Sequence, residues 1–252
     1  CRLEAGAEAH CVLTVRNGSS TSIVATGNGT RGAIFALYTL AETVLGVDPW
    51  WRVTDHAPAY ATGGSLSLPA DFSVVHAPPA FAYRGVFTND EDLLGYFRHD
   101  PLGESVFSLD TWNMIFETLL RAKCNMIIPG TSPNPDERHI ALANRRGLVT
   151  SQSHFEVMDF GAKEWLDGDV APRAIYNWTT NPDVMAHAWK AAIDANKDKE
   201  MIWTVGLRGL WDYAMCPKDM SDSTCGALVS GAISNQTSWI RAADGPDAKI
   251  IT

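Results

Sequence analysis

The second half of the chain alternates short apolar runs with longer amphipathic segments, and this alternation predicts repeated strand–helix units. The predicted strands are residues 83–88, 125–129, 147–152 and 201–206, and the predicted helices are residues 109–123, 135–146 and 180–195. Units of this kind place parallel strands side by side through right-handed crossovers. We therefore expect an α/β domain with a parallel sheet in this part of the chain.

Residues 1–60 follow another pattern, which predicts a small N-terminal α/β domain. Residues 11–25 read as two strands on either side of an Asn17-Gly18 turn, which is a hairpin signal. A helix is expected to have Thr30 as its N-cap and to end at Gly46. The pattern therefore predicts a small domain in which one helix packs on a hairpin.

Residues 61–80 are rich in Pro, Gly and Ser and are expected to link this domain to residues 81–252. The pattern of residues 81–252 fits a doubly wound sheet or the first half of a (β/α)8 barrel, and we favour the barrel. A Gly-rich phosphate loop is absent from the sequence, which disfavours a nucleotide-binding sheet. A closed barrel needs eight strands, and residues 249–252 read as the start of only a fifth. We therefore expect the chain to be the N-terminal portion of a longer enzyme.

Clusters of polar side chains follow at least three of the predicted strands, and they are the candidate site. In chain order the clusters are Asn89, Asp90 and Glu91, then His154 and Glu156, then Arg208 and Asp212. Carboxyl ends of parallel strands open onto one shared crevice, which is where such folds place their chemistry. We expect these side chains to converge on one face of the sheet and to form a site that works through carboxylates.

Composition and charge exclude several kinds of partner. The 252 residues carry a formal net charge of -9 and no Lys/Arg run, so neither nucleic acid nor an anionic membrane has electrostatic support. No stretch approaches the roughly 20 apolar residues of a membrane span. No His/Cys/Asp spacing marks a metal site, and we expect no cofactor.

The glycosylation sequons favour a secreted protein. Asn-x-Ser/Thr sequons start at Asn17, Asn28, Asn177 and Asn235. The five cysteines are too few for a disulfide scaffold. Candidate disulfides join Cys216 to Cys225 and Cys1 to Cys11, while Cys124 is expected to be a buried thiol.

Taken together, the motifs resemble glycoside hydrolase family 115, the xylan α-glucuronidases, over nearly the whole chain. The segments that carry the resemblance are residues 31–38, 46–51, 83–91, 116–125, 153–158, 164–165 and 206–212. Each segment is a modest match, but their order and spacing together are specific. The resemblance implies a small N-terminal α/β domain, then a (β/α)8 barrel that removes (4-O-methyl)glucuronic acid side groups from glucuronoxylan with inversion.

Inversion needs a carboxylic acid and a carboxylate roughly 6.5–9.5 Å apart. Asp90 or Glu91 and Glu156 are the candidates for this catalytic pair, with the two roles left open. The candidates for substrate binding are Asn89, His154, Arg208, Asp212 and Trp50. The planar fork of Arg208 suits the carboxylate of a uronic acid, and a Trp side chain suits a sugar ring.

Several of these residues also have a structural alternative. Glu156 would then orient His154, Arg208 would pair with Asp212, and Trp50 would serve packing. Two other functions also stay open, namely another exo-glycosidase of similar domain order, such as a hexosaminidase-like protein, and a non-catalytic carbohydrate-binding or truncated remnant. Departures from the family pattern at 128 and 155 favour the remnant.

The state of the chain in isolation and in the full-length protein is a further expectation. The 252 residues alone are expected to be inactive, because an exo-acting pocket needs groups from the missing strands, and to aggregate through uncovered strand edges. A homodimer of the full-length protein is compatible with the sequence.

Overall fold

The computed structural model describes residues 3–54, 56–58, 67–88, 108–129, 138–154, 156–160, 176–209 and 213–252. Its contacts divide the chain into two compact units. The first contains Cys1–Gly85, Trp112–Asn125 and Arg146–Leu148, and the second contains Val86–Thr111, Met126–Arg145 and Val149–Thr252. A three-stranded sheet, in the order β2-β1-β3, and a five-stranded sheet, in the order β4-β5-β6-β7-β8, account for the described strands.

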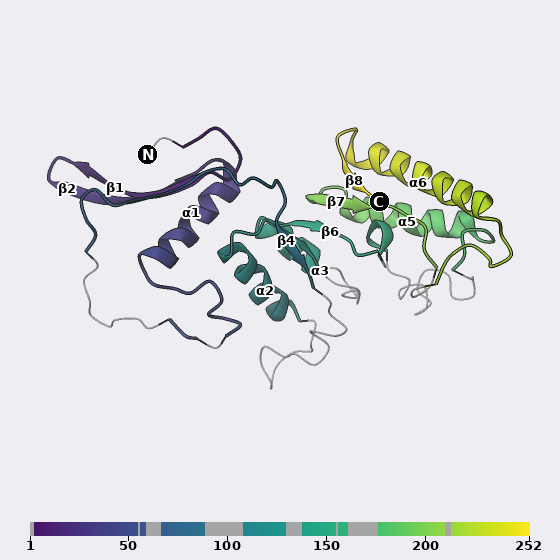
Figure 1. The fold of residues 1–252 in the computed structure, drawn as a ribbon, viewed down its shortest axis with the longest axis horizontal. Helices are drawn as coiled ribbons and strands as arrows, with labels where there is room; N and C mark the ends of the chain where they lie inside the picture. Colours follow the sequence, from purple (N-terminus) through teal and green to yellow (C-terminus); the bar gives the residue numbers. More distant parts are fainter. Residues whose placement is uncertain are drawn as a thin grey trace. The chain divides into compact units, whose positions relative to one another are not determined.

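The N-terminal sheet is built on the predicted hairpin. Strands β1 (His10–Asn17) and β2 (Ser20–Gly27) pair antiparallel, and the pairing of Asn17 with Ser20 closes the turn. Helix α1 (Gly29–Thr43) lies along this sheet (Figure 1). The predicted hairpin and helix are therefore confirmed.

Two details of this unit differ from the expectation. Strand β3 (Ser73–His76) pairs antiparallel with β1, so part of the expected linker, residues 61–80, is a strand of the first sheet. Its short apolar pair did not stand out from the surrounding prolines, but the free edge of β1 provides backbone partners. Helix α1 has Asn28, not Thr30, at its N-cap position, and the Asn28 side chain donates to the backbone oxygens of Glu4 and Gly6.

Close packing of α1 on the hairpin depends on a pair of glycines. A Cβ atom on Gly27 would lie 2.1 Å from the backbone carbon of Gly32. Because a contact that short is impossible, only glycine at position 27 lets the end of β2 approach the first turn of α1 this closely. The approach brings Phe35 and Ala36, both fully buried, onto the same sheet as the buried Val12.

A buried carboxylate organises the entry to the second sheet. Glu8 is 7% exposed, and its two carboxylate oxygens receive Nη2 of Arg84 at 2.5 Å and Nδ2 of Asn125 at 2.8 Å. Asn125 also pairs with the backbone of Arg84, because its Oδ1 accepts from the Arg84 N–H and its own N–H donates to the Arg84 oxygen, both at 2.8 Å. The charge of Glu8 is thus neutralised by the residues that lead into two neighbouring strands.

These two strands begin the five-stranded sheet. It consists of β4 (Gly85–Phe87), β5 (Met126–Ile128), β6 (Val149–Ser151), β7 (Met201–Thr204) and β8 (Lys249–Ile251). The pairs β5–β6, β6–β7 and β7–β8 are parallel. The four predicted strands and the strand expected at the end of the chain are all present.

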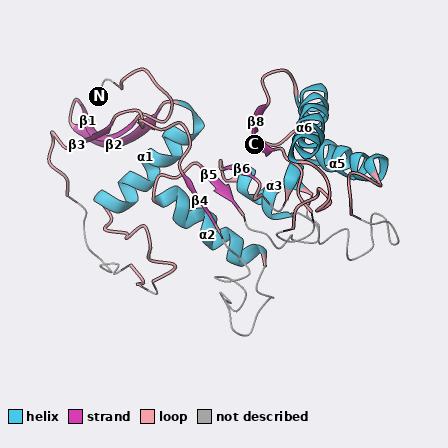
Figure 2. Cartoon of the chain, turned by 45° about the vertical axis from the view of Figure 1, so that its right-hand side comes forward, coloured by secondary structure: helices cyan, strands magenta, loops and turns pink. Residues whose placement is uncertain are grey.

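The described helices between residues 109 and 244 alternate with these strands along the chain, and all but the last were predicted from the sequence. They are α2 (Leu109–Arg121), α3 (Arg138–Arg145), α5 (Pro182–Asn196) and α6 (Asp222–Asp244), with a short 3-10 turn η2 (Val157–Asp159). Helices α5 and α6 lie side by side (Figures 1 and 2). The core beneath them contains Trp189 of α5, Ile240 of α6 and Trp203 of β7, each at most 1% exposed.

The sequence pattern missed the longest of these helices, α6. Its fully buried positions are Ala232, Gln236 and Ile240, so one of these three is polar, while Ile233, Trp239 and Ala243 are only partly buried against the core. The helix is set instead by its N-cap, where the Ser221 hydroxyl accepts the N–H of Thr224 at 3.3 Å. Tertiary contacts then stabilise a segment whose own apolar pattern is weak.

The cysteines are arranged largely as predicted. Cys216 and Cys225 form a disulfide with a Cα–Cα separation of 5.8 Å. Cys11 is disulfide-bonded, and its expected partner Cys1 lies outside the described residues. Cys124 is a free thiol, partly rather than fully buried, and burial raises its pKa. In the described part of the chain, no helix is long and apolar enough to cross a membrane.

The Glu8 carboxylate gives a stability prediction. In the full-length protein, Glu8→Ala should lower the free energy of unfolding by about 3 kcal/mol, because Arg84 and Asn125 lose their shared acceptor. That corresponds to a fall of roughly 6–12 °C in the unfolding midpoint of this unit, measured by scanning calorimetry. Glu42→Ala is the control, because Glu42 pairs with Lys123 at the surface and should cost less than about 1 kcal/mol. Equal shifts for the two variants would contradict the prediction.

Candidate active site

The carboxyl ends of β5 to β8 share one edge of the sheet, because these strands are parallel. His154 and Glu156 follow β6, and Arg208 follows β7. The structure therefore places these three predicted site residues at the exits of two neighbouring strands. His154 is exposed, and Glu156 and Arg208 are partly buried.

The first predicted cluster comes at the end of β4. Asn89, Asp90 and Glu91 lie outside the described residues, but Thr88, immediately before them, is described and 9% exposed. The Thr88 N–H donates to the oxygen of Ile128 at 3.0 Å, and at the other end of the pair the Asn125 N–H donates to the Arg84 oxygen. Residue numbers therefore increase in the same direction along both strands. This pattern is that of parallel pairing, so β4 ends at the same edge as β5.

The remaining predicted residues are Asp212 and Trp50. Asp212 lies outside the described residues. Trp50 belongs to the first unit, in the turns that follow α1, where its backbone N–H donates to Oδ1 of Asp48 at 2.7 Å. Its side chain is 50% exposed. Trp50 is therefore open to a ligand but is not on the sheet that carries the other candidates.

Tight turns fix the backbone that follows β6. The N–H of Glu156 donates to the Ser153 oxygen at 3.1 Å, and the N–H of Asp159 donates to the Glu156 oxygen at 3.0 Å. Met158 and Asp159 both have left-handed backbone angles, with φ of 56° and 61°. Strained backbone of this kind persists only where its surroundings hold it, and here Asn196 of α5 donates to the Asp159 carboxylate.

Two glutamine side chains hold the exit of β7. Oε1 of Gln152 accepts the Thr204 N–H at 2.7 Å, and the Thr204 hydroxyl donates to the Gln152 backbone oxygen at 2.9 Å. Gln236 of α6 accepts the Gly206 N–H at 2.9 Å and donates to the Gly206 oxygen at 2.7 Å. Neither glutamine was predicted from the sequence. Gln152 is the last residue of the predicted strand 147–152, whereas Gln236 lies in a helix that the pattern did not predict.

Arg208 lies between two fixed points of this loop. Gly206 is held by Gln236, and the Gly209 N–H donates to the Tyr213 oxygen at 3.0 Å. Burial lowers the pKa of Arg208, but a guanidinium stays protonated at neutral pH. The loop therefore presents a permanent positive charge at the carboxyl edge.

These side chains supply the groups that acid–base chemistry on an anionic substrate requires. Glu156 can exchange a proton, His154 can donate or accept a hydrogen bond, and the Arg208 fork can pair with a carboxylate. Gln152 is 3% exposed, and its Nε2 has no hydrogen-bond partner among the described residues. No group of His, Cys, Asp and Glu in the described part of the chain could hold a metal ion.

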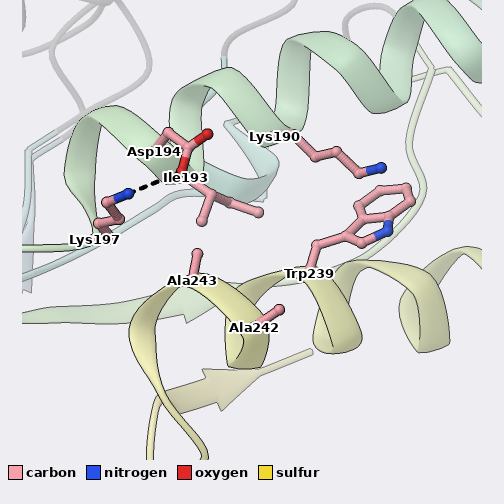
Figure 3. Close-up of a pocket in the computed structure, with 7 residues that line it drawn as sticks. All are labelled: Lys190, Ile193, Asp194, Lys197, Trp239, Ala242 and Ala243. Carbon is pink, nitrogen blue, oxygen red and sulfur yellow. Dashed lines mark hydrogen bonds and ion pairs between the residues drawn. The ribbon is translucent and has the colours of Figure 1, made fainter.

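A surface groove lies between α5 and α6, well separated from these residues along the chain. It has a volume of about 370 Å³, and Figure 3 shows Lys190 of α5 above the ring of Trp239 of α6, 4.5 Å from its centre. The groove follows the C-terminal halves of both helices, which return the chain to the amino ends of β7 and β8.

The fold and these side chains define a class, an α/β protein with its polar groups gathered where parallel strands end. The model of glycosyl hydrolase family 115 matches residues 76–252, more than half of the chain, and the chain belongs to this family. The match covers the whole five-stranded sheet and the residues that follow its strands.

A solved structure agrees with this fold. The chain superposes on a family GH115 4-O-methyl-α-glucuronidase, BtGH115A, with specificity for decorated arabinogalactans, at a TM-score of 0.82 and 21% identity. The superposition covers 98% of this chain but 33% of the other, so the chain spans about a third of the length of that structure. A search of curated proteins gave no significant match.

The loop around Arg208 offers a matched pair of glycine substitutions. A Cβ atom on Gly209 would lie 2.8 Å from the Tyr213 oxygen, whereas one on Gly206 would meet nothing within 4 Å. Gly209→Ala should therefore displace the loop and cost about 1–3 kcal/mol, whereas Gly206→Ala should change stability by less than about 1 kcal/mol. Hydrogen exchange of the peptide that spans the loop measures the effect. Faster exchange in both variants, or in neither, would refute this account.

Proposed function

We propose that the full-length protein is a glycoside hydrolase that removes (4-O-methyl)glucuronic acid side groups from a plant polysaccharide, with glucuronoxylan as the first candidate. Family membership supports the reaction class. The observation that carries the proposal is the placement of a carboxylate, Glu156, and a cation, Arg208, after neighbouring parallel strands at one edge of the sheet. A uronic acid requires both groups, one for cleavage and one for recognition.

The proposed fold of residues 81–252 is the first half of a (β/α)8 barrel. The order β4-β5-β6-β7-β8 supports it, because neighbouring strands follow the order of the chain without the reversal that marks a doubly wound sheet. In a barrel the remaining strands would enclose the sugar and exclude water. The inactivity expected for residues 1–252 alone follows from the same proposal.

The proposed mechanism is inversion by two carboxyl groups. One, as the acid, protonates the leaving oxygen, and the other, as the base, takes a proton from a water molecule on the opposite face of the sugar. Glu156 is the described member of the pair, and Asp90 or Glu91 after β4 is its proposed partner. Strands β4 and β6 are separated in the sheet by β5 alone. Because adjacent strands lie about 4.8 Å apart, this places the two strand ends about 10 Å apart, which leaves room for a water molecule.

Arg208 is proposed to bind the substrate carboxylate, with His154, Asn89 and Asp212 as further contacts to the sugar. A guanidinium fork pairs with a carboxylate through two parallel hydrogen bonds, which fixes the ring as well as binding it. The net charge of -9 would otherwise repel an anionic sugar, so a local cation is needed. The structural relative BtGH115A has specificity for decorated arabinogalactans, and a decorated arabinogalactan is therefore the second candidate substrate.

Substitution of Glu156 tests the mechanism. In the full-length protein, Glu156→Gln should lower kcat for release of 4-O-methylglucuronic acid at least about a hundredfold, because it removes the ionisable group and keeps its shape. Glu200→Gln is the matched control, because Glu200 directly precedes β7, at the opposite end of the strands, and should leave kcat unchanged. Release is measured by chromatography on glucuronoxylan and arabinogalactan oligosaccharides.

Each result of this assay has a defined meaning. A wild-type enzyme that releases uronic acid from neither oligosaccharide would refute the proposed function. Near wild-type turnover by Glu156→Gln would remove Glu156 from the mechanism while leaving the family assignment intact. Preference for one oligosaccharide identifies the polysaccharide on which the enzyme acts.

We further propose that the protein is secreted and glycosylated. The disulfide between Cys216 and Cys225 supports this, because disulfides persist mainly in oxidising compartments. The four sequons differ in their surroundings. Asn17 and Asn235 are exposed, whereas Nδ2 of Asn28 donates to two backbone oxygens at 2.9 Å. A glycan on Nδ2 would break one of these bonds.

Glycan mapping tests this proposal. When the protein is secreted from a eukaryotic host, Asn17 and Asn235 should carry glycans and Asn28 should not. Mass spectrometry after enzymatic deglycosylation in heavy-oxygen water identifies the occupied asparagines. Retention of the protein inside the cell, or a glycan on Asn28 with Asn17 and Asn235 empty, would contradict it.

A further inference from the structure

The loop that carries Arg208 is fixed by contacts from three different elements. The Thr204 N–H is bonded to Gln152, which follows β6, and the Val205 N–H donates to the Ile251 oxygen of β8 at 2.8 Å. Gly206, the next residue, is bonded to Gln236 of α6. Thr204, Val205 and Gly206 are therefore each hydrogen-bonded to a different element. The last of them is two residues before Arg208.

The Gln236 contact differs from the other two in its chemistry. The sheet ladder ends at Thr204, so Gly206 has no strand to pair with. The Gln236 side chain takes the place of that strand, because its carboxamide oxygen accepts the Gly206 N–H and its NH₂ group donates to the Gly206 oxygen. Bonds of 2.9 and 2.7 Å satisfy both polar groups of Gly206.

Without these two hydrogen bonds, a glutamine at position 236 would lower the stability of the fold. It is fully buried on α6, at 0% exposure, where the neighbouring inward positions are Ala232 and Ile240. A buried amide costs stability unless each of its groups is hydrogen-bonded, and an apolar residue would pack there without that requirement. Both groups of the Gln236 amide are bonded to Gly206, so its burial is compensated only while the loop keeps this conformation.

We propose that Gln236 is a positioning residue that sets the place of the Arg208 guanidinium and thereby the preference of the site for a uronic acid. This inference rests on the proposed function, since it takes Arg208 to be the group that binds the substrate carboxylate. Gln236 acts through the Gly206 backbone and touches no substrate. Its loss should weaken the recognition of charge far more than the binding of a neutral sugar.

The experiment compares glucuronic acid with the neutral glucuronamide as competitive inhibitors of the full-length enzyme. In wild type the acid should bind more tightly than the amide, and Arg208→Met should abolish that preference. Gln236→Met, which keeps the side-chain length and loses both bonds, should reduce the preference at least about tenfold. Ser234→Ala, at an exposed position of the same helix, should leave the preference unchanged.

A double-mutant cycle then separates positioning from general destabilisation. If Gln236 acts through Arg208, Gln236→Met should have almost no further effect on the inhibition constants in the Arg208→Met background. If Gln236→Met does not fold, Gln236→Glu serves in the same cycle, because it keeps the acceptor for the Gly206 N–H and loses the donor. Calorimetry on each variant confirms that it is folded.

Two outcomes would overturn the inference while leaving the proposed function in place. One is an active wild-type enzyme in which the two substitutions have additive effects. The other is an equal loss of affinity for glucuronic acid and glucuronamide, which would make Gln236 a general support of the fold. An inactive wild-type enzyme would instead overturn the proposed function itself.

Discussion

The pairing of the Glu8 carboxylate with Arg84 and Asn125 is the interaction on which the second sheet depends. A buried charge must be neutralised, and these two residues do so only when they lie side by side. Their backbone groups are then in register, with the Asn125 N–H on the Arg84 oxygen. Because β4 and β5 start directly after them, the same contact fixes the register in which the two strands begin.

The chemistry of the candidate site follows from that alignment. Once the strands are parallel and in register, the residues directly after β6 and β7 share an edge whatever their distance in sequence. The site then needs its loops held in place. Here buried amides, Gln152 and Gln236, perform this task by completing hydrogen bonds that the short strands leave open.

The apolar periodicity of the sequence predicted the elements that have one apolar face. It did not predict elements whose buried positions include polar side chains. The strands β4 to β8 and the helices α2, α3 and α5 follow directly from their apolar periodicity. Helix α6 does not, because its inward positions include Gln236 and its stability comes from packing on α5 and the sheet. Strand β3 was hidden for a similar reason, since only pairing with β1 makes a strand of four residues within a Pro-rich segment.

The sequence by itself determined the class of fold, the short Cys216–Cys225 bridge and the residues Glu156, His154 and Arg208 as candidates, because alternation and strand-end polarity are local properties. Tertiary structure decided that Arg84 and Asn125, both inside segments that resemble the family, pair with Glu8 in the protein interior. It also revealed Gln236, whose partner Gly206 is 30 residues away. A hydrogen bond between distant residues leaves no periodic signal in the sequence, so only the folded chain can show which polar residues support the site and which form it.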